Sequence, residues 1–132
     1  MKFQKMRFDN DCTLASVSMA LRRPYESILK IAKENGFIPY GKWGFDVYTL
    51  LHHLGYDCSC RVYIQSRGIR PIPIRQPFIV SIPSLNNRGG FHAVVVENGK
   101  VYDPSNLRRA SFEYVMRTRR HMYYDFEKEN IT

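Results

Sequence analysis

The first half of the chain carries apolar residues at the three- and four-residue spacing of amphipathic helices. This pattern predicts a helix between Asp11 and Pro24, a second over 25–35 and a third over 47–54. Asp11 stands where the first helix would be capped, and Pro24 should separate the first helix from the second. Gly36 and Gly55 supply the expected stops of the second and third helices. The apolar positions that define the first and third helices are Leu14, Val17, Leu21, Val47, Leu50, Leu51 and Leu54.

The pattern changes after Asp57, where apolar and polar residues alternate with the period of two that is typical of a half-buried strand. The continuous apolar run 78–82 predicts a central strand, and residues 91–97 and 100–103 predict two more. Residues 66–77 hold three prolines and a glycine and are interpreted as a loop. Helices followed by antiparallel strands predict an α+β fold, with N-terminal helices packed on a C-terminal antiparallel β-sheet.

The last two predicted strands are joined by Asn98-Gly99, a strong signal for a two-residue hairpin turn. With these two residues at the turn, Val94 faces Asp103 across the hairpin. His92, two residues before Val94, then shares the face of Asp103 and lies diagonal to it, about 7 Å away between backbones. The hairpin therefore predicts an imidazole and a carboxylate within reach of each other.

Cys12 directly follows the expected N-cap of the first helix. A thiol becomes a strong nucleophile as its thiolate, which a helix N-terminus and a neighbouring imidazolium both favour. The imidazole in turn needs a third group to fix its tautomer and orientation. Cys12, His92 and Asp103 together supply these three parts. A lone cysteine on an apolar helix is more often a small core residue, so that alternative stays open.

These residues resemble the papain-like cysteine peptidases, and most closely the small C39-like branch. The resemblance rests on Asp11-Cys12 with Ala15 and Met19, on the segment 90–96 that contains His92, on Asp103-Pro104, and on the helical stretch 51–56. It covers roughly residues 4 to 105 and keeps the family's order of Cys, His and Asp. It implies one stand-alone papain-like peptidase domain over residues 1–132. It also implies roles for three residues: Cys12 as nucleophile, His92 as general base and acid, and Asp103 as the orienting residue.

The family usually places a glutamine about six residues before the cysteine, where it donates to the oxyanion hole. Position 6 of this chain is Met6, and the nearest glutamine is Gln4. Gln4 and Asn10 are therefore the candidates for a side-chain donor. The backbone N–H of Cys12 is expected to contribute one donor in either case.

Composition narrows the setting of the predicted site. A chain of 132 residues fits one domain, and its net charge of +8 favours acidic partners. Three cysteines cannot all pair within the chain, which favours a reducing compartment. No signal peptide and no apolar run of about 18 residues is found, so we expect a cytoplasmic protein, or one delivered into a host cytoplasm, that does not enter a membrane. The expected partner is a peptide or protein substrate, and no cofactor or metal is expected.

Three alternatives remain at this stage. The first is a catalytically inactive papain-like domain that binds a protein partner. The second is a basic nucleic-acid-binding protein, although the chain carries no recognised nucleic-acid motif. The third is a zinc site, against which the one-residue gap between its two cysteines argues. The basic residues of the nucleic-acid alternative are Arg108, Arg109, Arg117, Arg119 and Arg120, and the residues of the zinc alternative are His52, His53, Cys58 and Cys60.

Overall fold

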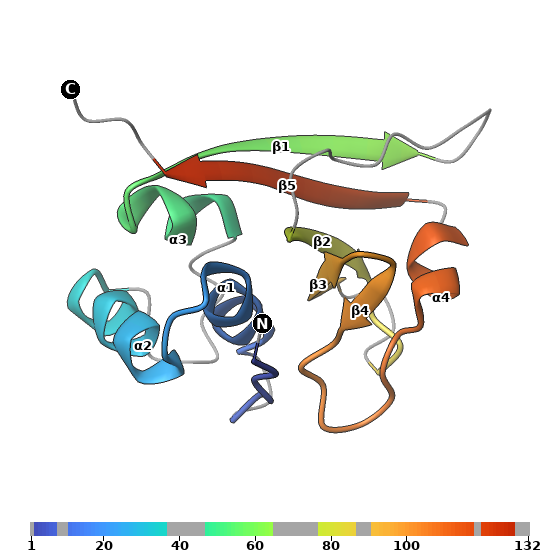
Figure 1. Ribbon diagram of the computed structural model, residues 1–132, viewed down its shortest axis with the longest axis horizontal. Coiled ribbons are helices and arrows are strands. Elements are labelled where there is room, and N and C mark those ends of the chain that lie inside the picture. The colour runs from blue at the N-terminus through green and yellow to red at the C-terminus, as the bar shows by residue number, and fades with distance from the viewer. Residues whose placement is uncertain are drawn as a thin grey trace.

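The computed structural model describes residues 2–7, 11–36, 47–64, 77–86, 91–117 and 120–128. In the described part of the chain, three helices come first, four strands follow, and a fourth helix precedes the last strand (Figure 1). Within the described ranges, no helix has the length and apolar character needed to cross a membrane. The elements are α1 (Cys12–Leu21), α2 (Tyr25–Glu34), α3 (Val47–His53), β1 (Tyr56–Ile64), β2 (Phe78–Pro83), β3 (Phe91–Glu97), β4 (Lys100–Tyr102), α4 (Phe112–Arg117) and β5 (Arg120–Lys128).

The three predicted helices are present. Gly36 and Gly55, which follow α2 and α3, adopt φ values of +74° and +86°, the left-handed conformation that ends a helix most easily at glycine. Asp11 is the N-cap residue of α1, but the expectation that its side chain caps the helix is wrong. Its carboxylate is fully buried and is used for other contacts, described below.

The strands form one five-stranded sheet with the order β1-β5-β2-β3-β4, and every described pairing is antiparallel. The fold is therefore α+β, as predicted. The strand β2 lies in the middle of the sheet, and five of its six residues are buried. This burial on both faces explains why its sequence is a continuous apolar run rather than an alternating one.

The elements after Asp103 were not predicted from the sequence. The sequence marks Arg120 only as one of the basic residues of the nucleic-acid alternative, yet β5 begins there. This strand lies between β1 and β2 and pairs with both, so that Met122 is opposite Val62 on one side and Ser81 on the other. The helix α4 precedes β5 and interrupts the expected order of helices first and strands afterwards.

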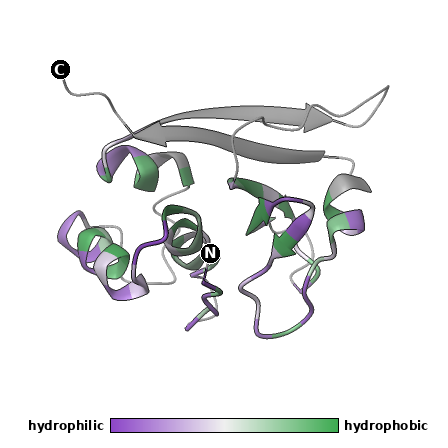
Figure 2. Ribbon diagram, viewed as in Figure 1, coloured by the Kyte–Doolittle hydropathy of each residue, from purple (hydrophilic) through white to green (hydrophobic). Residues whose placement is uncertain are grey.

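Two clusters of buried side chains hold the sheet, one on each face of β3. Ala93 and Val95 pack with the buried residues of α1, α2 and α3, whereas Val94 and Val96 pack with Ala110 and the α4 residue Val115. The amphipathic α2 directs its hydrophobic residues inward and its hydrophilic ones outward (Figure 2). Alternate side chains of β3 thus pack against the helices α1, α2 and α3 on one face and against the segment that follows β4 on the other.

The register of the β3–β4 hairpin is confirmed. Val95 pairs with Tyr102, Val96 with Val101 and Glu97 with Lys100, which leaves Asn98 and Gly99 as the turn. Both turn residues have positive φ, +52° and +77°, as a type I′ turn requires. The strand β4 ends one residue earlier than predicted, so Asp103 lies just beyond it.

Candidate functional site

The imidazole of His92 and the carboxylate of Asp103 are in direct contact. The Nε2 atom of His92 lies 2.5 Å from Oδ1 of Asp103, and their side chains are 12% and 2% exposed. The second residue of β3 and the residue after β4 are thus brought together by the hairpin between them. This is the neighbourhood that the turn predicts, and the two side chains meet in a largely water-free environment.

The carboxylate of Asp103 is held from the other sides by backbone donors. The N–H of Ser105 donates to Oδ1 at 2.9 Å, and the N–H of Ala110 donates to Oδ2 at 2.7 Å. Burial alone would raise the pKa of Asp103, but the hydrogen bond and charge of His92, followed by the two backbone N–H groups, hold it below its ordinary value. Asp103 is therefore an ionised acceptor that cannot rotate away from the imidazole.

The loop that carries these backbone donors is fastened by Asn86. Its Nδ2 donates to Ser105 Oγ at 3.1 Å and to the carbonyl of Arg108 at 3.0 Å, while its Oδ1 accepts from the N–H of Arg108 at 3.2 Å. Asn86 lies after β2, so it ties the segment between β2 and β3 to the loop after Asp103. The position of the carboxylate is thus fixed from both sides of β3.

Cys12 is the first residue of α1 and is half-buried. Cys12 acts on the imidazole of His92 through a side-chain hydrogen-bond interaction and through charge, and Nε2 of that imidazole already contacts Asp103. Burial opposes a charge on the imidazole, but the hydrogen bond to Asp103 and then the hydrogen bond and charge of Cys12 raise the pKa of His92 to about 9. The imidazole of His92 therefore interacts with the thiol of Cys12 on one side and with the ionised carboxylate of Asp103 on the other.

Ser16 fixes α1 against β3. It lies four residues after Cys12, on the same face of the helix, and its buried hydroxyl donates to the carbonyl of Ala93 at 2.9 Å. Ala93 is the neighbour of His92 in β3. One hydrogen bond therefore sets the distance between the element that carries the thiol and the element that carries the imidazole.

We expect Ser16→Ala to destabilise the fold by about 1–3 kcal/mol, because the buried carbonyl of Ala93 loses its donor. The variant should also slow the alkylation of Cys12, since α1 is no longer held in register with β3. Chemical denaturation and labelling kinetics measure the two effects. Ser18→Ala is the matched control: Ser18 donates to Arg23 in the turn after α1, so its loss should leave labelling of Cys12 unchanged.

Asp11 anchors the start of α1 to α2. Its Oδ2 accepts from the backbone N–H of Arg7 at 2.9 Å and from the hydroxyl of Tyr25 at 2.6 Å, and the guanidinium of Arg7 lies 4.3 Å from the centre of the Tyr25 ring. Asp11 thus fixes the chain that leads into Cys12.

Gln4, one of the two candidates for a side-chain oxyanion donor, makes no described contact with Cys12. The amide of Gln4 donates to the carbonyl of Lys5 at 2.7 Å, and Gln4 lines a pocket whose lining excludes Cys12, His92 and Asp103. Asn10 lies outside the described residues. Met6, where a glutamine was expected, packs against the helical core. The first N–H groups of α1 have no acceptor within the helix, so the Cys12 N–H is the donor that the fold itself provides.

The residues of the zinc alternative are only partly described. His52 and His53 are exposed at the end of α3, and the side chains of Cys58 and Cys60 lie outside what the structure describes. Among the described side chains, no group of three or more His, Cys, Asp and Glu is placed to hold a metal ion. In the basic set of the nucleic-acid alternative, Arg109 donates to the carbonyl of Ser105 and stacks 4.8 Å from the centre of the Phe3 ring.

The charge on His92 makes stability depend on pH. A histidine whose pKa is raised stabilises the fold fully below its unfolded pKa near 6.5 and loses that contribution as the pH rises toward about 9. In Cys12→Ser, where this position no longer titrates and Asp103 still raises the pKa of His92, we expect the free energy of unfolding to fall by roughly 1 kcal/mol over that window. Denaturation at pH 6 and pH 9 measures it. In the double variant Cys12→Ser with His92→Gln, the part of the decrease that comes from His92 should be absent.

Several residues that build the site were missed in the sequence. Ser16, Asn86 and Ala110 act through contacts between segments far apart in the chain, which no local pattern announces. Ser105 had a signal, because an aspartate followed by Pro-Ser is typical of a turn in which the carboxylate accepts from the N–H two residues on.

No family model matches the chain, and no curated protein matches it. The functional argument therefore depends on the geometry of Cys12, His92 and Asp103.

Proposed function

We propose that this protein is a cysteine peptidase, or a related thiol acyl hydrolase, with a papain-like fold in one domain. One observation carries the proposal: Asp103 holds one ring nitrogen of the largely buried His92 at 2.5 Å, and Cys12 interacts with the same imidazole. A thiol, a base and an orienting group in contact in this order are the parts of a nucleophilic acyl-transfer site. The placement of the cysteine at the start of a helix that packs on an antiparallel sheet also supports the papain-like assignment.

The geometry supports a two-step reaction. The Cys12 sulfur attacks the substrate carbonyl, and the resulting oxyanion is placed to accept from the Cys12 backbone N–H. The charged His92 then protonates the leaving amine, and the acyl group remains on sulfur as a thioester. In the second step His92 takes a proton from water, the hydroxide oxygen attacks the thioester, and the carboxylic acid leaves while the thiol is restored. Asp103 stabilises the imidazolium in both steps.

Apolar surface near the site supports a peptide or isopeptide substrate. Phe91 is 48% exposed and directly precedes His92, and Leu107 is 75% exposed in the loop after Asp103. Exposed apolar side chains next to a reactive group offer contacts for the side chains of a polypeptide. The free thiol of Cys12 must stay reduced to act, which favours a cytoplasmic setting.

A library of unmodified peptides tests the proposal. Mass spectrometry should detect new peptide ends with the wild-type chain that are absent with Cys12→Ala and with His92→Ala. In the presence of hydroxylamine, part of the product should appear as the hydroxamate, because the amine intercepts the thioester. A chain that labels rapidly at Cys12 yet cleaves no peptide in the library would favour the catalytically inactive, partner-binding alternative.

A further inference from the structure

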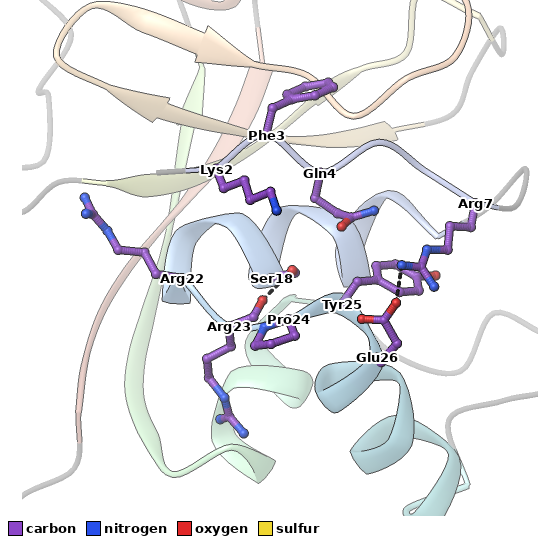
Figure 3. A pocket seen from close by; sticks show the side chains of 10 residues that line it. All are labelled: Lys2, Phe3, Gln4, Arg7, Ser18, Arg22, Arg23, Pro24, Tyr25 and Glu26. Carbon is purple, nitrogen blue, oxygen red and sulfur yellow. Dashed lines mark hydrogen bonds and ion pairs between the residues drawn. The ribbon is translucent and has the colours of Figure 1, made fainter.

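A second feature of the molecule lies outside the proposed catalytic site. A cavity of about 500 Å³ opens between the N-terminal segment 2–7 and the turn that joins α1 to α2 (Figure 3). This volume is in the range of cavities that enclose a ligand of several tens of atoms. The residues that line it are Lys2, Phe3, Gln4, Arg7, Ser18, Arg22, Arg23, Pro24, Tyr25 and Glu26.

The cavity carries an excess of positive charge. Among the described residues that line it, four are cations and Glu26 is the one acid. Glu26 is paired with Arg7, and Arg22 is paired at 3.1 Å with Glu97, which lies outside the cavity. Among the described residues, Lys2 and Arg23 form no ion pair. The end of the cavity near Lys2 therefore lacks the negative charge that would balance it.

The cations are spread along the cavity instead of converging on one point. In Figure 3 the side chain of Lys2 reaches toward α1, whereas Arg22 and Arg23 extend outward at the same end and Arg7 lies at the other end. A single phosphate is held by donors that point at one position. Spaced cations instead fit a ligand whose negative groups are themselves spaced.

Arg22, at the end of the cavity near Lys2, has an unfavourable backbone conformation. Its φ is +56°, in the left-handed region where glycine is the usual residue after a helix. The turn is closed by backbone hydrogen bonds from Arg22 to Met19 and from Arg23 to Ser18, which make no use of the arginine side chain. The chain therefore keeps a charged side chain at a position where glycine would relieve the backbone.

We propose that this cavity binds an acidic segment of a polypeptide, with carboxylates near Lys2, Arg22 and Arg23 and an apolar side chain against Pro24. Pro24 is exposed and offers apolar surface beside the cations, whereas the ring of Phe3 points away from α1 and is stacked by Arg109 (Figure 3). Assigning this segment to the substrate rests on the proposed function. Binding itself does not, since the cavity lining excludes Cys12, His92 and Asp103.

Binding of a fluorescent hexaglutamate peptide tests the site, measured by anisotropy on the full chain carrying Cys12→Ala so that cleavage plays no part. We expect Lys2→Gln with Arg23→Gln to weaken binding at least tenfold at low salt. Arg22→Gly should weaken it severalfold while keeping or raising the midpoint of thermal unfolding. A residue that only supports the fold would not combine these two effects.

Two control variants separate the cavity from the overall charge. Lys33→Gln removes an exposed cation at the far end of α2. Asn98→Gly places a glycine at Asn98, which, like Arg22, has a positive φ among the described residues. Neither variant should change binding. An equal loss in Lys33→Gln, no binding at all, or tighter binding of pyrophosphate or of an oligonucleotide of equal charge would each overturn the proposal. Binding of the peptide by a wild-type chain that cleaves no peptide would support the proposed binding site and contradict the proposed peptidase function.

Discussion

Iodoacetamide should modify Cys12 at pH 6 roughly 10–100 times faster in the wild-type chain than in His92→Ala. At this pH an ordinary thiol is almost fully protonated, and only the thiolate reacts. In the wild-type chain the imidazole of His92 is charged at pH 6, because its pKa is raised to about 9. The positive charge beside the sulfur and the negative charge on it stabilise each other, and His92→Ala removes the first of them.

Peptide-level mass spectrometry follows the reaction at Cys12 separately from Cys58 and Cys60. His52→Ala is the matched control, since it removes an exposed histidine from α3 and should leave the labelling rate unchanged. Asp103 offers an internal check: its removal should slow labelling less than loss of His92 does. Equal rates in the wild-type chain and in His92→Ala would sink the idea of an activated thiol.

Asp103→Asn should lower the rate of peptide cleavage by about two to four orders of magnitude. The two oxygens of Asp103 accept from His92, Ser105 and Ala110. An asparagine can present its oxygen to His92 and Ser105, but its NH2 group must then face the N–H of Ala110. The imidazolium loses its counter-charge, and two buried donors oppose each other at a cost of about 1–3 kcal/mol in the free energy of unfolding.

The two effects are measured by kcat/KM on a cleaved peptide and by chemical denaturation. The pKa of His92, followed by NMR of its ring, should fall toward its ordinary value in Asp103→Asn, because the hydrogen bond to Asp103 is the main contact that raises it. Glu34→Gln is the control, since it neutralises an exposed carboxylate 4.0 Å from Lys30 on α2. An unchanged pKa of His92 in Asp103→Asn would contradict the orienting role.

The parts of the site that follow from local rules could be predicted. The Asn98-Gly99 turn sets the register of the hairpin by itself, because both residues accept positive φ, and the register brings His92 beside Asp103. The start of α1 at Cys12 follows equally from the apolar spacing of the helix. These features depend on residues close together in the chain.

The parts that depend on distant segments could not be predicted. Aspartate is a common helix-capping residue, yet the carboxylate of Asp11 accepts hydrogen bonds from Tyr25 and Arg7 and does not cap the helix that it precedes. The strand β5 was hidden because its sequence begins with arginine and carries polar residues among its aromatic ones. Its place in the sheet is set by β1 and β2, which lie far before it in the chain.

The position of β5 has a consequence for how the protein is made. Of the five strands, β5 is the last to be synthesised, yet in the sheet it is the one that connects β1 to β2. Until residue 128 has left the ribosome, β1 lacks its partner among the described strands and the edge of β2 that pairs with β5 stays open, two conditions that favour misassembly. Native pairing of β1 with β5 therefore waits for the end of this segment. A chain stopped before β5 would expose both strands to solvent and to neighbouring chains.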